Sequence, residues 1–276
     1  MAENKSTSTP PAASGKNMSS MLAMIVIPLS FVVAFCLWKF MMGNGANFEG
    51  GNNELAPLKG NFLGIVYKGG IVVPFLITFL ITVLTFTIER LLTIMKAKGS
   101  GSVSSFVRDI KYNLETGNLA AAKAACDKQK GSVANVVKSA LDKYGEMLNE
   151  THLTRDQKVI AIQKEVEEAT SLEMPMLEKN LTIIATIASI ATLGGLFGTV
   201  LGMIRSFQAM SAAGAPDASA LSTGISEALI NTALGIGTSA ISIIMYNYFT
   251  SAIDELSYGI EEAGFTITQT FASKSN

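Results

Sequence analysis

The sequence has very few of the residues that build most metal sites and active sites. It contains a single histidine, His152, and two cysteines, Cys36 and Cys126, among 276 residues. One cysteine lies in an apolar run and the other in a polar region, which excludes a disulfide framework and a zinc-ligand cluster. We therefore expect both cysteines to be packing residues and His152 to be a surface residue. The sequence predicts no metal, no cofactor and no catalytic residue.

Charge is scarce as well. Only 16% of the residues are charged and 49% are hydrophobic, which is too apolar for an ordinary soluble domain of this length. The formal net charge of -1 offers no basic surface for nucleic acid. This composition predicts an all-α integral membrane protein, in which long transmembrane helices extend into a cytoplasmic helical bundle.

Four apolar segments are long enough to cross a membrane. The first carries only Lys39, whose long stem can reach the headgroup layer, next to Trp38, which suits the interface. A cleaved signal peptide is the alternative for this segment, although the run is long for one. The predicted order is a disordered tail (1–20), transmembrane helix 1 (21–42), a periplasmic loop (43–70), transmembrane helix 2 (71–95), a cytoplasmic helical region (96–180), transmembrane helix 3 (181–207), a periplasmic turn (208–217), transmembrane helix 4 (218–253) and a cytoplasmic tail (254–276).

The orientation follows from the basic residues near the ends of the apolar segments. Lysines and arginines follow helix 2 and precede helix 3, so the region between them is expected in the cytoplasm, together with both termini. Lys59 and Lys68 lie in the loop assigned to the other side. Apolar residues at intervals of three and four predict cytoplasmic helices at 104–114, 118–129, 132–148 and 156–174, with Pro175 interrupting the last. No phosphate-binding loop or nucleophile motif suggests a catalytic domain there.

Glu227 is the only charged residue in the fourth apolar segment. Burying a carboxylate at the membrane centre costs about 2.5–3.5 kcal/mol on insertion scales, so such a residue usually has a function. It lies about ten residues after the expected helix cap at Asp217, which at about 1.5 Å per residue places it well inside the bilayer. If the turn dips into the membrane, Glu227 instead lies at the headgroup level.

The fourth segment has a polar face if it is a helix. At about 100° per residue, one arc collects the residues Glu227, Asn231, Gly235, Thr238, Ser242 and Tyr246, with Thr232 and Ser239 at its edge. The opposite face, which includes Leu229 and Ile244, is apolar and suits lipid. A polar face of this kind lines a wet passage or hydrogen-bonds another helix. Glu227 favours the passage.

The third segment carries three glycines spaced four residues apart, Gly194, Gly198 and Gly202. This small-xxx-small pattern lets another backbone approach closely, and it predicts an oligomer of tightly packed helices. Thr192, Thr199 and Ser206 recur every seven residues on a neighbouring stripe, which is expected to face the interior of such an assembly.

These residues resemble a known family. Residues 194–207, GGLFGTVLGMIRSF, are similar to the glycine-rich membrane helix of ExbB and TolQ. Residues 224–229, GISEAL, and 232–235, TALG, with Tyr246 and Asn247, are similar to the final membrane helix of that family in content and spacing. Through these motifs the chain resembles the MotA/TolQ/ExbB proton channel family over roughly residues 70–260, and it is most like ExbB.

The resemblance implies a function and partners. It implies a homopentamer in the bacterial inner membrane, whose third and fourth helices surround a pore that holds the single membrane helices of an ExbD- or TolR-like partner. An aspartate of the partner would carry the proton, with Thr199, Thr232 and Glu227 lining the pore opposite it. Asn231, Thr238 and Ser242 complete the predicted lining. Proton flow would drive rotation and energise a TonB-like transducer of outer-membrane transport.

The sequence departs from the family pattern at two positions in the membrane helices. Thr192 and Ile241 stand where the family usually has proline, so the kinks expected there are in doubt. The extra first span is similar to the layout of MotA, the flagellar stator, whereas the residues from Gly198 to Met203 favour ExbB or TolQ. A scaffold that conducts no ions would also use the glycines but not Glu227. An intramembrane enzyme would need a catalytic pair that the segments lack.

Overall fold

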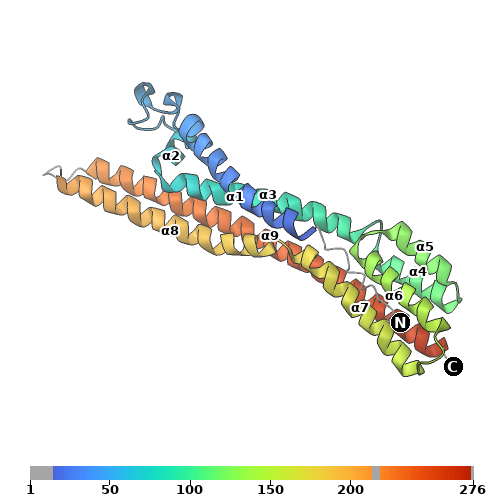
Figure 1. Cartoon of the computed structure of the whole chain (residues 1–276). Coiled ribbons are helices and arrows are strands. Elements are labelled where there is room, and N and C mark those ends of the chain that lie inside the picture. The colour runs from blue at the N-terminus through green and yellow to red at the C-terminus, as the bar shows by residue number, and fades with distance from the viewer. Residues whose placement is uncertain (1–14, 213–217, 275–276) are drawn as a thin grey trace, which may run out of the picture. The chain divides into compact units, whose positions relative to one another are not determined.

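The computed structural model describes residues 15–212 and 218–274, and this part of the chain is built from helices, with one isolated β-bridge between Phe48 and Pro57 (Figure 1). The predicted all-α class is confirmed. The tail before residue 15 lies outside the described residues, as does the part of the predicted turn after residue 212. The helices are α1 (Gly15–Cys36), η1 (Leu37–Met42), η2 (Gly45–Asn47), η3 (Glu49–Gly51), α2 (Phe62–Lys68), α3 (Val72–Lys98), α4 (Val103–Glu115), α5 (Leu119–Gln129), α6 (Gly131–Asn149), α7 (Arg155–Glu178), α8 (Leu181–Ala212) and α9 (Ala218–Lys274).

Four helical stretches in the described residues are long and apolar enough to cross a membrane, and each overlaps one of the four apolar segments recognised in the sequence. They leave many large apolar side chains exposed on the single chain, among them Met24 (73%), Leu84 (46%) and Phe197 (59%). Exposing such surface to water costs about 25 cal/mol per Å². Lipid or other protein chains must therefore cover these helices.

The chain divides into two compact units. Unit 1 consists of residues 1–82 and 191–238, and unit 2 consists of residues 83–190 and 239–276. Three helices, α3, α8 and α9, contribute to both units because each is continuous through a boundary. In unit 1, the buried side chains of Ala34, Val66 and Val73 form a core that joins α1, α2 and α3, and Ile230 and Leu234 of α9 pack against it.

Residues 43–70, which we call the cap, were predicted as a loop and are folded by a small polar and aromatic network. The side-chain amide of Asn47 donates to the carbonyls of Met41 (2.8 Å) and Met42 (2.9 Å), and its oxygen accepts from Asn61 (3.0 Å). The rings of Trp38 and Tyr67 stack at 4.8 Å. This network fixes α2 and its last residue, Lys68, above the start of α3.

Unit 2 contains the four predicted cytoplasmic helices as α4, α5, α6 and α7. The last part of α9 packs with them: the rings of Tyr144 and Phe271 meet edge to face at 4.9 Å, and the ammonium group of Lys274 donates to the carbonyls of Leu114 and Glu115 at 2.6 Å each. Residues 254–274, which were expected to form a tail, are therefore a helical component of this unit.

The helix end expected at Pro175 is wrong, because α7 continues to Glu178 with the proline inside it. The reason is a contact that is distant in sequence. Arg90, 1% exposed, donates to the carbonyls of Met176 and Leu177 at 3.1 Å each and thereby caps the last turn of α7. The chain then turns at Asn180, which has a positive φ of 63°.

Among the single residues discussed above, Cys126 is buried in α5 and His152 is exposed, as predicted. Cys36 was also expected to pack but is exposed on α1. Its surroundings in the full assembly are therefore lipid or another chain rather than the core of unit 1.

Candidate functional site

Helices α8 and α9 are in backbone contact within unit 1, and we call this contact the seam. A Cβ atom added to Gly195 would lie 2.8 Å from the carbonyl oxygen of Asn231, and one added to Gly235 would lie 2.5 Å from that of Ala191. Side chains at these two positions would push the helices apart. Gly195 and Gly235 were not singled out from the sequence as packing residues. The sequence features that could have indicated them are the adjacent glycines Gly194 and Gly195 and the position of Gly235 on the polar arc.

The predicted glycine stripe also packs inside one chain. A Cβ on Gly198 would lie 2.6 Å from the side chain of Asn231, and one on Gly202 would lie 2.6 Å from that of Ala228. Gly194 faces α3 instead, where its Cβ would meet Leu76 at 3.3 Å. The stripe thus brings helices of one protomer together, and the oligomer remains a prediction that must rest on other surfaces.

Two threonines meet across the seam. The hydroxyl groups of Thr199 and Thr232, from α8 and α9, are hydrogen-bonded to each other. Thr199 is also 3.2 Å from the carbonyl oxygens of Gly195 and Ala228. A hydroxyl donates one hydrogen, so one threonine donates to the other, and the second donates to a carbonyl. The structure therefore places together the two threonines that the sequence predicted as lining residues.

Asn231 lies one helical turn before Gly235 on α9 and is 2% exposed. Its amide donates to the carbonyl of Gly69 in the cap at 2.9 Å. Its side-chain oxygen has no hydrogen-bond partner within the described residues. A buried acceptor without a partner costs about 1–3 kcal/mol, so its presence needs a reason.

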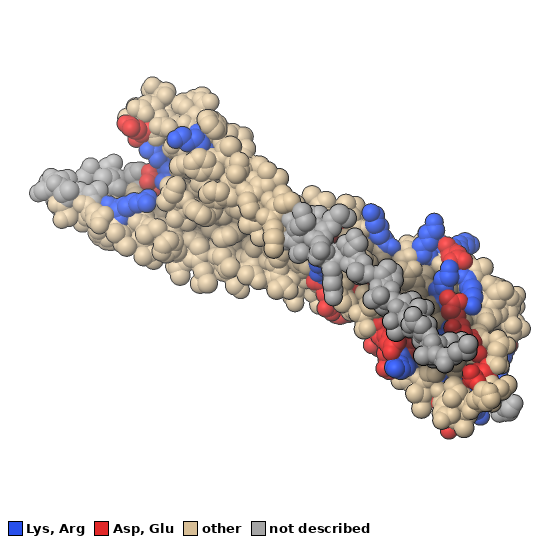
Figure 2. Space-filling model, in the orientation of Figure 1, with Lys and Arg blue, Asp and Glu red and all other residues tan. Residues whose placement is uncertain are grey.

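Glu227 lines a pocket beneath the cap. The pocket has a volume of about 290 Å³, and its walls are Pro57, Leu58, Lys59, Gly60, Ile65, Lys68, Ser226 and Glu227. Lys68 and Arg205 both lie within electrostatic reach of Glu227. The ammonium group of Lys68 is fixed by a hydrogen bond to the carbonyl of Glu54 (3.0 Å) and lies 5.9 Å from the centre of the Phe48 ring. In Figure 2, basic and acidic atoms both appear at the cap, while the helices next to it present uncharged side chains.

The position of Glu227 bears on its depth. The lysine that acts on it ends α2, before the first residue of α3, so Glu227 lies at the level of the cap. Its depth in a membrane stays a prediction.

The rest of the predicted polar arc points into the protein. Asn231, Thr238 and Ser242 are 2%, 3% and 0% exposed, whereas Leu229 and Ile244 on the opposite face are 55% and 65% exposed. The two-faced character expected for this helix is present. The assignment of Asn231, Thr238 and Ser242 to a pore lining stays a prediction, because in the single chain they are covered by its own helices.

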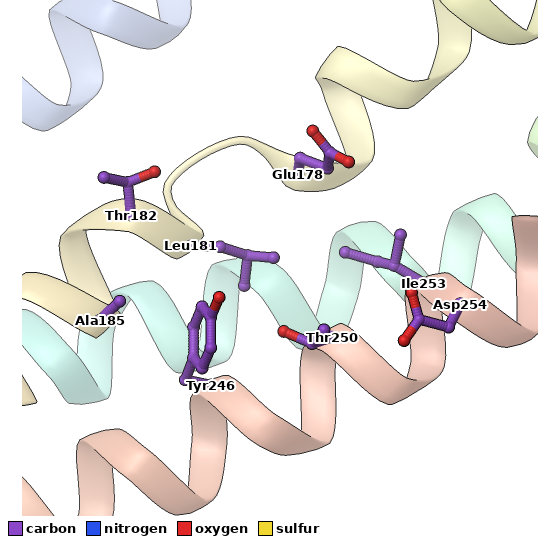
Figure 3. Close-up of a pocket in the computed structure, with 8 residues that line it drawn as sticks. All are labelled: Glu178, Leu181, Thr182, Ala185, Tyr246, Thr250, Ile253 and Asp254. Carbon is purple, nitrogen blue, oxygen red and sulfur yellow. The ribbon is translucent and has the colours of Figure 1, made fainter.

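A second polar pocket, of about 330 Å³, lies in unit 2 at the junction of α7 and α8 (Figure 3). Tyr246, Thr250 and Asp254 lie one turn apart along α9 and face this junction, where Glu178 ends α7. The hydroxyl of Thr250 is buried without a partner in the described residues. Of these residues, only Tyr246 was named from the sequence. The spacing of four residues between Tyr246, Thr250 and Asp254 could have indicated that the three side chains share one face of a helix.

Comparison with known proteins identifies a family and several relatives. Residues 128–262 match the sequence profile of the MotA/TolQ/ExbB proton channel family. A putative biopolymer transport protein, ExbB-like 3, of Synechocystis is 40% identical over 88 residues, which are 31% of this chain and 42% of that protein. The biopolymer transport protein ExbB of Helicobacter pylori is 43% identical over 81 residues, 29% of this chain and 56% of that protein.

A third relative is the Tol-Pal system protein TolQ of Pseudomonas aeruginosa, 27% identical over 124 residues, which are 45% of this chain and 54% of that protein. The chain thus spans about half the length of the curated relatives it matches. Thr199, Glu227 and Thr232 all lie inside the region that matches the family, whereas the cap lies outside it. The chain therefore contains a domain of the MotA/TolQ/ExbB proton channel family.

Proposed function

We propose that this membrane protein is a proton-channel subunit of the ExbB–ExbD type, which uses the proton motive force to energise TonB-dependent transport across an outer membrane. The observation that carries the proposal is the hydroxyl pair of Thr199 and Thr232 on the seam, with Glu227 close by on α9, inside the region that matches the family. Hydroxyl groups without a fixed charge can stabilise a transient water path or a partner's carboxylate without trapping a cation.

The proposal includes a homo-oligomer, a pentamer by resemblance, in the bacterial inner membrane. Support for other chains against this one comes from α8, where Leu196, Phe197 and Val200 are 56%, 59% and 49% exposed. Lipid and neighbouring copies would cover these side chains. An ExbD- or TolR-like single-span protein would occupy the pore, and a TonB-like protein would receive the output. The protein is proposed to act without enzymatic chemistry of its own.

A TolQ-type role in a Tol-Pal system is the second candidate. It is favoured by the TolQ match, which covers a longer part of this chain than the two ExbB matches described above. The ion-conducting step would be the same, and the two roles differ in the transducer that is energised.

The proposal is tested by proton uptake into liposomes that contain the chain and the single-span protein purified with it. Moving a charge across about 100 mV releases about 2.3 kcal/mol, so an imposed potential should drive uptake in the wild type. Thr199→Val and Thr232→Val retain volume and remove a hydroxyl, and Glu227→Gln removes the titratable group. We expect all three to assemble and to lose most of the uptake.

The matched control is Thr186→Val, because the hydroxyl of Thr186 is exposed and donates only to the carbonyl of Thr182 in its own helix. This variant should take up protons at the wild-type rate. If the assembled wild type shows no uptake under any potential, the protein is a scaffold and the proposed function is wrong.

A further inference from the structure

The pocket beneath the cap has room for water and ends at a carboxylate. Its volume of about 290 Å³ would hold about ten water molecules at roughly 30 Å³ each. The polar side chains of Lys59, Lys68, Ser226 and Glu227 can bind them, and Lys59 and Ser226 are exposed at its walls. The pocket belongs to unit 1 alone, so a single subunit is sufficient to form it.

The next polar side chain along α9 after Glu227 is that of Asn231. Asn231 follows Glu227 by four residues, which places the two side chains on the same face of the helix, one turn apart. Its side-chain oxygen is buried and has no hydrogen-bond partner among residues 15–212 and 218–274. A water molecule that continues from the pocket would supply the missing donor. Thr232 and Thr199, which are hydrogen-bonded to each other, follow on the seam.

The charges around the pocket select which ion can use it. Lys59 and Lys68 line the pocket together with Glu227, and Lys68 and Arg205 lie within electrostatic reach of the Glu227 carboxylate. Lys68 is held in place by the carbonyl of Glu54 and lies near the ring of Phe48. The lining therefore holds two cations and one anion, and this excess of positive charge lowers the local concentration of metal cations. A proton can still be delivered through water to the carboxylate, which it neutralises.

We infer that the pocket beneath the cap is a water-filled entrance, through which protons rather than metal cations reach Glu227 and Asn231 within one subunit. The identity of the ion rests on the proposed function, whereas the presence of a hydrated, positively charged entrance does not. The cap lies outside residues 128–262, the region that matches the family, and in this proposal it controls access to the membrane helices.

Thiol labelling tests the entrance without requiring transport. Ser226→Cys, in a background with Cys36→Ala and Cys126→Ala, should react with an anionic methanethiosulfonate faster than with a cationic one of similar size. We expect Lys68→Gln to reduce this preference by about tenfold. Lys39→Gln removes an exposed charge outside the pocket and should leave the preference unchanged. If Ser226→Cys reacts with neither reagent, or Lys68→Gln does not alter the preference, the inference is overturned.

Blocking the pocket tests its role in uptake. Ile65→Trp should fill the pocket, slow the labelling of Ser226→Cys and slow proton uptake, whereas Phe62→Trp, on the same helix but 64% exposed and outside the pocket, should change neither. Leu58→Trp provides a second block from another wall. Size-exclusion chromatography confirms that the variants assemble. Normal uptake in both blocked variants overturns the inference and leaves the proposed function standing. If the labelling follows the prediction but the wild type takes up no protons, the hydrated entrance stands and the proposed function is wrong.

Discussion

Glu227 shows how the surroundings of one residue change its interpretation. In an apolar helix viewed alone, a carboxylate suggests a group at the membrane centre, where its burial is most expensive. In the structure its neighbours include Lys68, Arg205 and the walls of a pocket that can hold water. Fixed positive charges and hydration both reduce the cost of keeping the carboxylate ionised. The interpretation of Glu227 therefore depends on residues of other helices, which the pattern within its own helix does not reveal.

Cys126 provides a prediction at the same scale. Its thiol is 3% exposed, and burial raises its pKa to about 12. The reactive thiolate is therefore almost absent from the folded protein at pH 8. In a Cys36→Ala variant we expect an alkylating reagent to modify Cys126 only after unfolding by denaturant.

The same shift has a consequence for stability. An unfolded thiol ionises near pH 8.5, and the folded one does so only near 12. The contribution of the neutral, buried thiol to the free energy of unfolding is therefore full below pH 8.5 and declines as the pH rises from there toward 12. Fast labelling of Cys126 in the native protein at pH 8 would contradict the predicted low reactivity of its thiol. It would show that α5, the helix that carries Cys126, opens readily.

At the scale of helices, the effect of replacing a glycine by alanine depends on whether that glycine lies in the seam. Gly198→Ala places a methyl group 2.6 Å from Asn231, whereas a Cβ at Gly237, two residues beyond Gly235 on α9, would meet no atom within 4 Å. Overpacking costs typically about 1–3 kcal/mol, and replacing a helical glycine by alanine in open space gains roughly 0.5–1 kcal/mol. We expect Gly198→Ala to lower the melting temperature in detergent and Gly237→Ala to raise it slightly or leave it unchanged. Equal melting temperatures would show that the seam is loose.

Much of the helical architecture could be predicted from the sequence, since hydropathy and periodicity are local properties. The four apolar helices and the helices α4 to α7 follow from them. The end of α7 could not be predicted, because its last carbonyls are capped by Arg90, 86 residues away. The cap could not either, since its Gly- and Asn-rich sequence indicates a loop, and its fold depends on Asn47 and on the stacking of Trp38 with Tyr67.

The candidate site also has a part that could be predicted from the sequence and a part that could not. The pairing of Thr199 with Thr232 could be anticipated, because both carry hydroxyls on helices expected to pack together. The contact of Asn231 with Gly69 joins residues 162 positions apart, and no periodicity within α9 points to the cap. The lysine beside Glu227 was missed for the same reason: Lys68 was read only as a basic residue in an outer loop.

At the scale of the whole molecule, the basic residues predict a topology. Lysines and arginines are frequent from residue 90 to residue 179, and such residues favour the cytoplasmic side. The cap is joined to α1 at one end and to α3 at the other, so if unit 2 is cytoplasmic, the cap is on the opposite side. On the proposed function, protons driven by the membrane potential would then enter at the cap and leave on the cytoplasmic side.

This topology is testable with single cysteines. Glu54 in the cap and Lys111 in α4 are both exposed. In a background with Cys36→Ala and Cys126→Ala, we expect a membrane-impermeant maleimide, added to cells with a permeabilised outer membrane, to label Glu54→Cys and to leave Lys111→Cys unlabelled until the inner membrane is also opened. Labelling of Lys111→Cys from outside would invert the topology. The cap pocket would then face the cytoplasm, where it would serve as the exit for protons and not as their entrance.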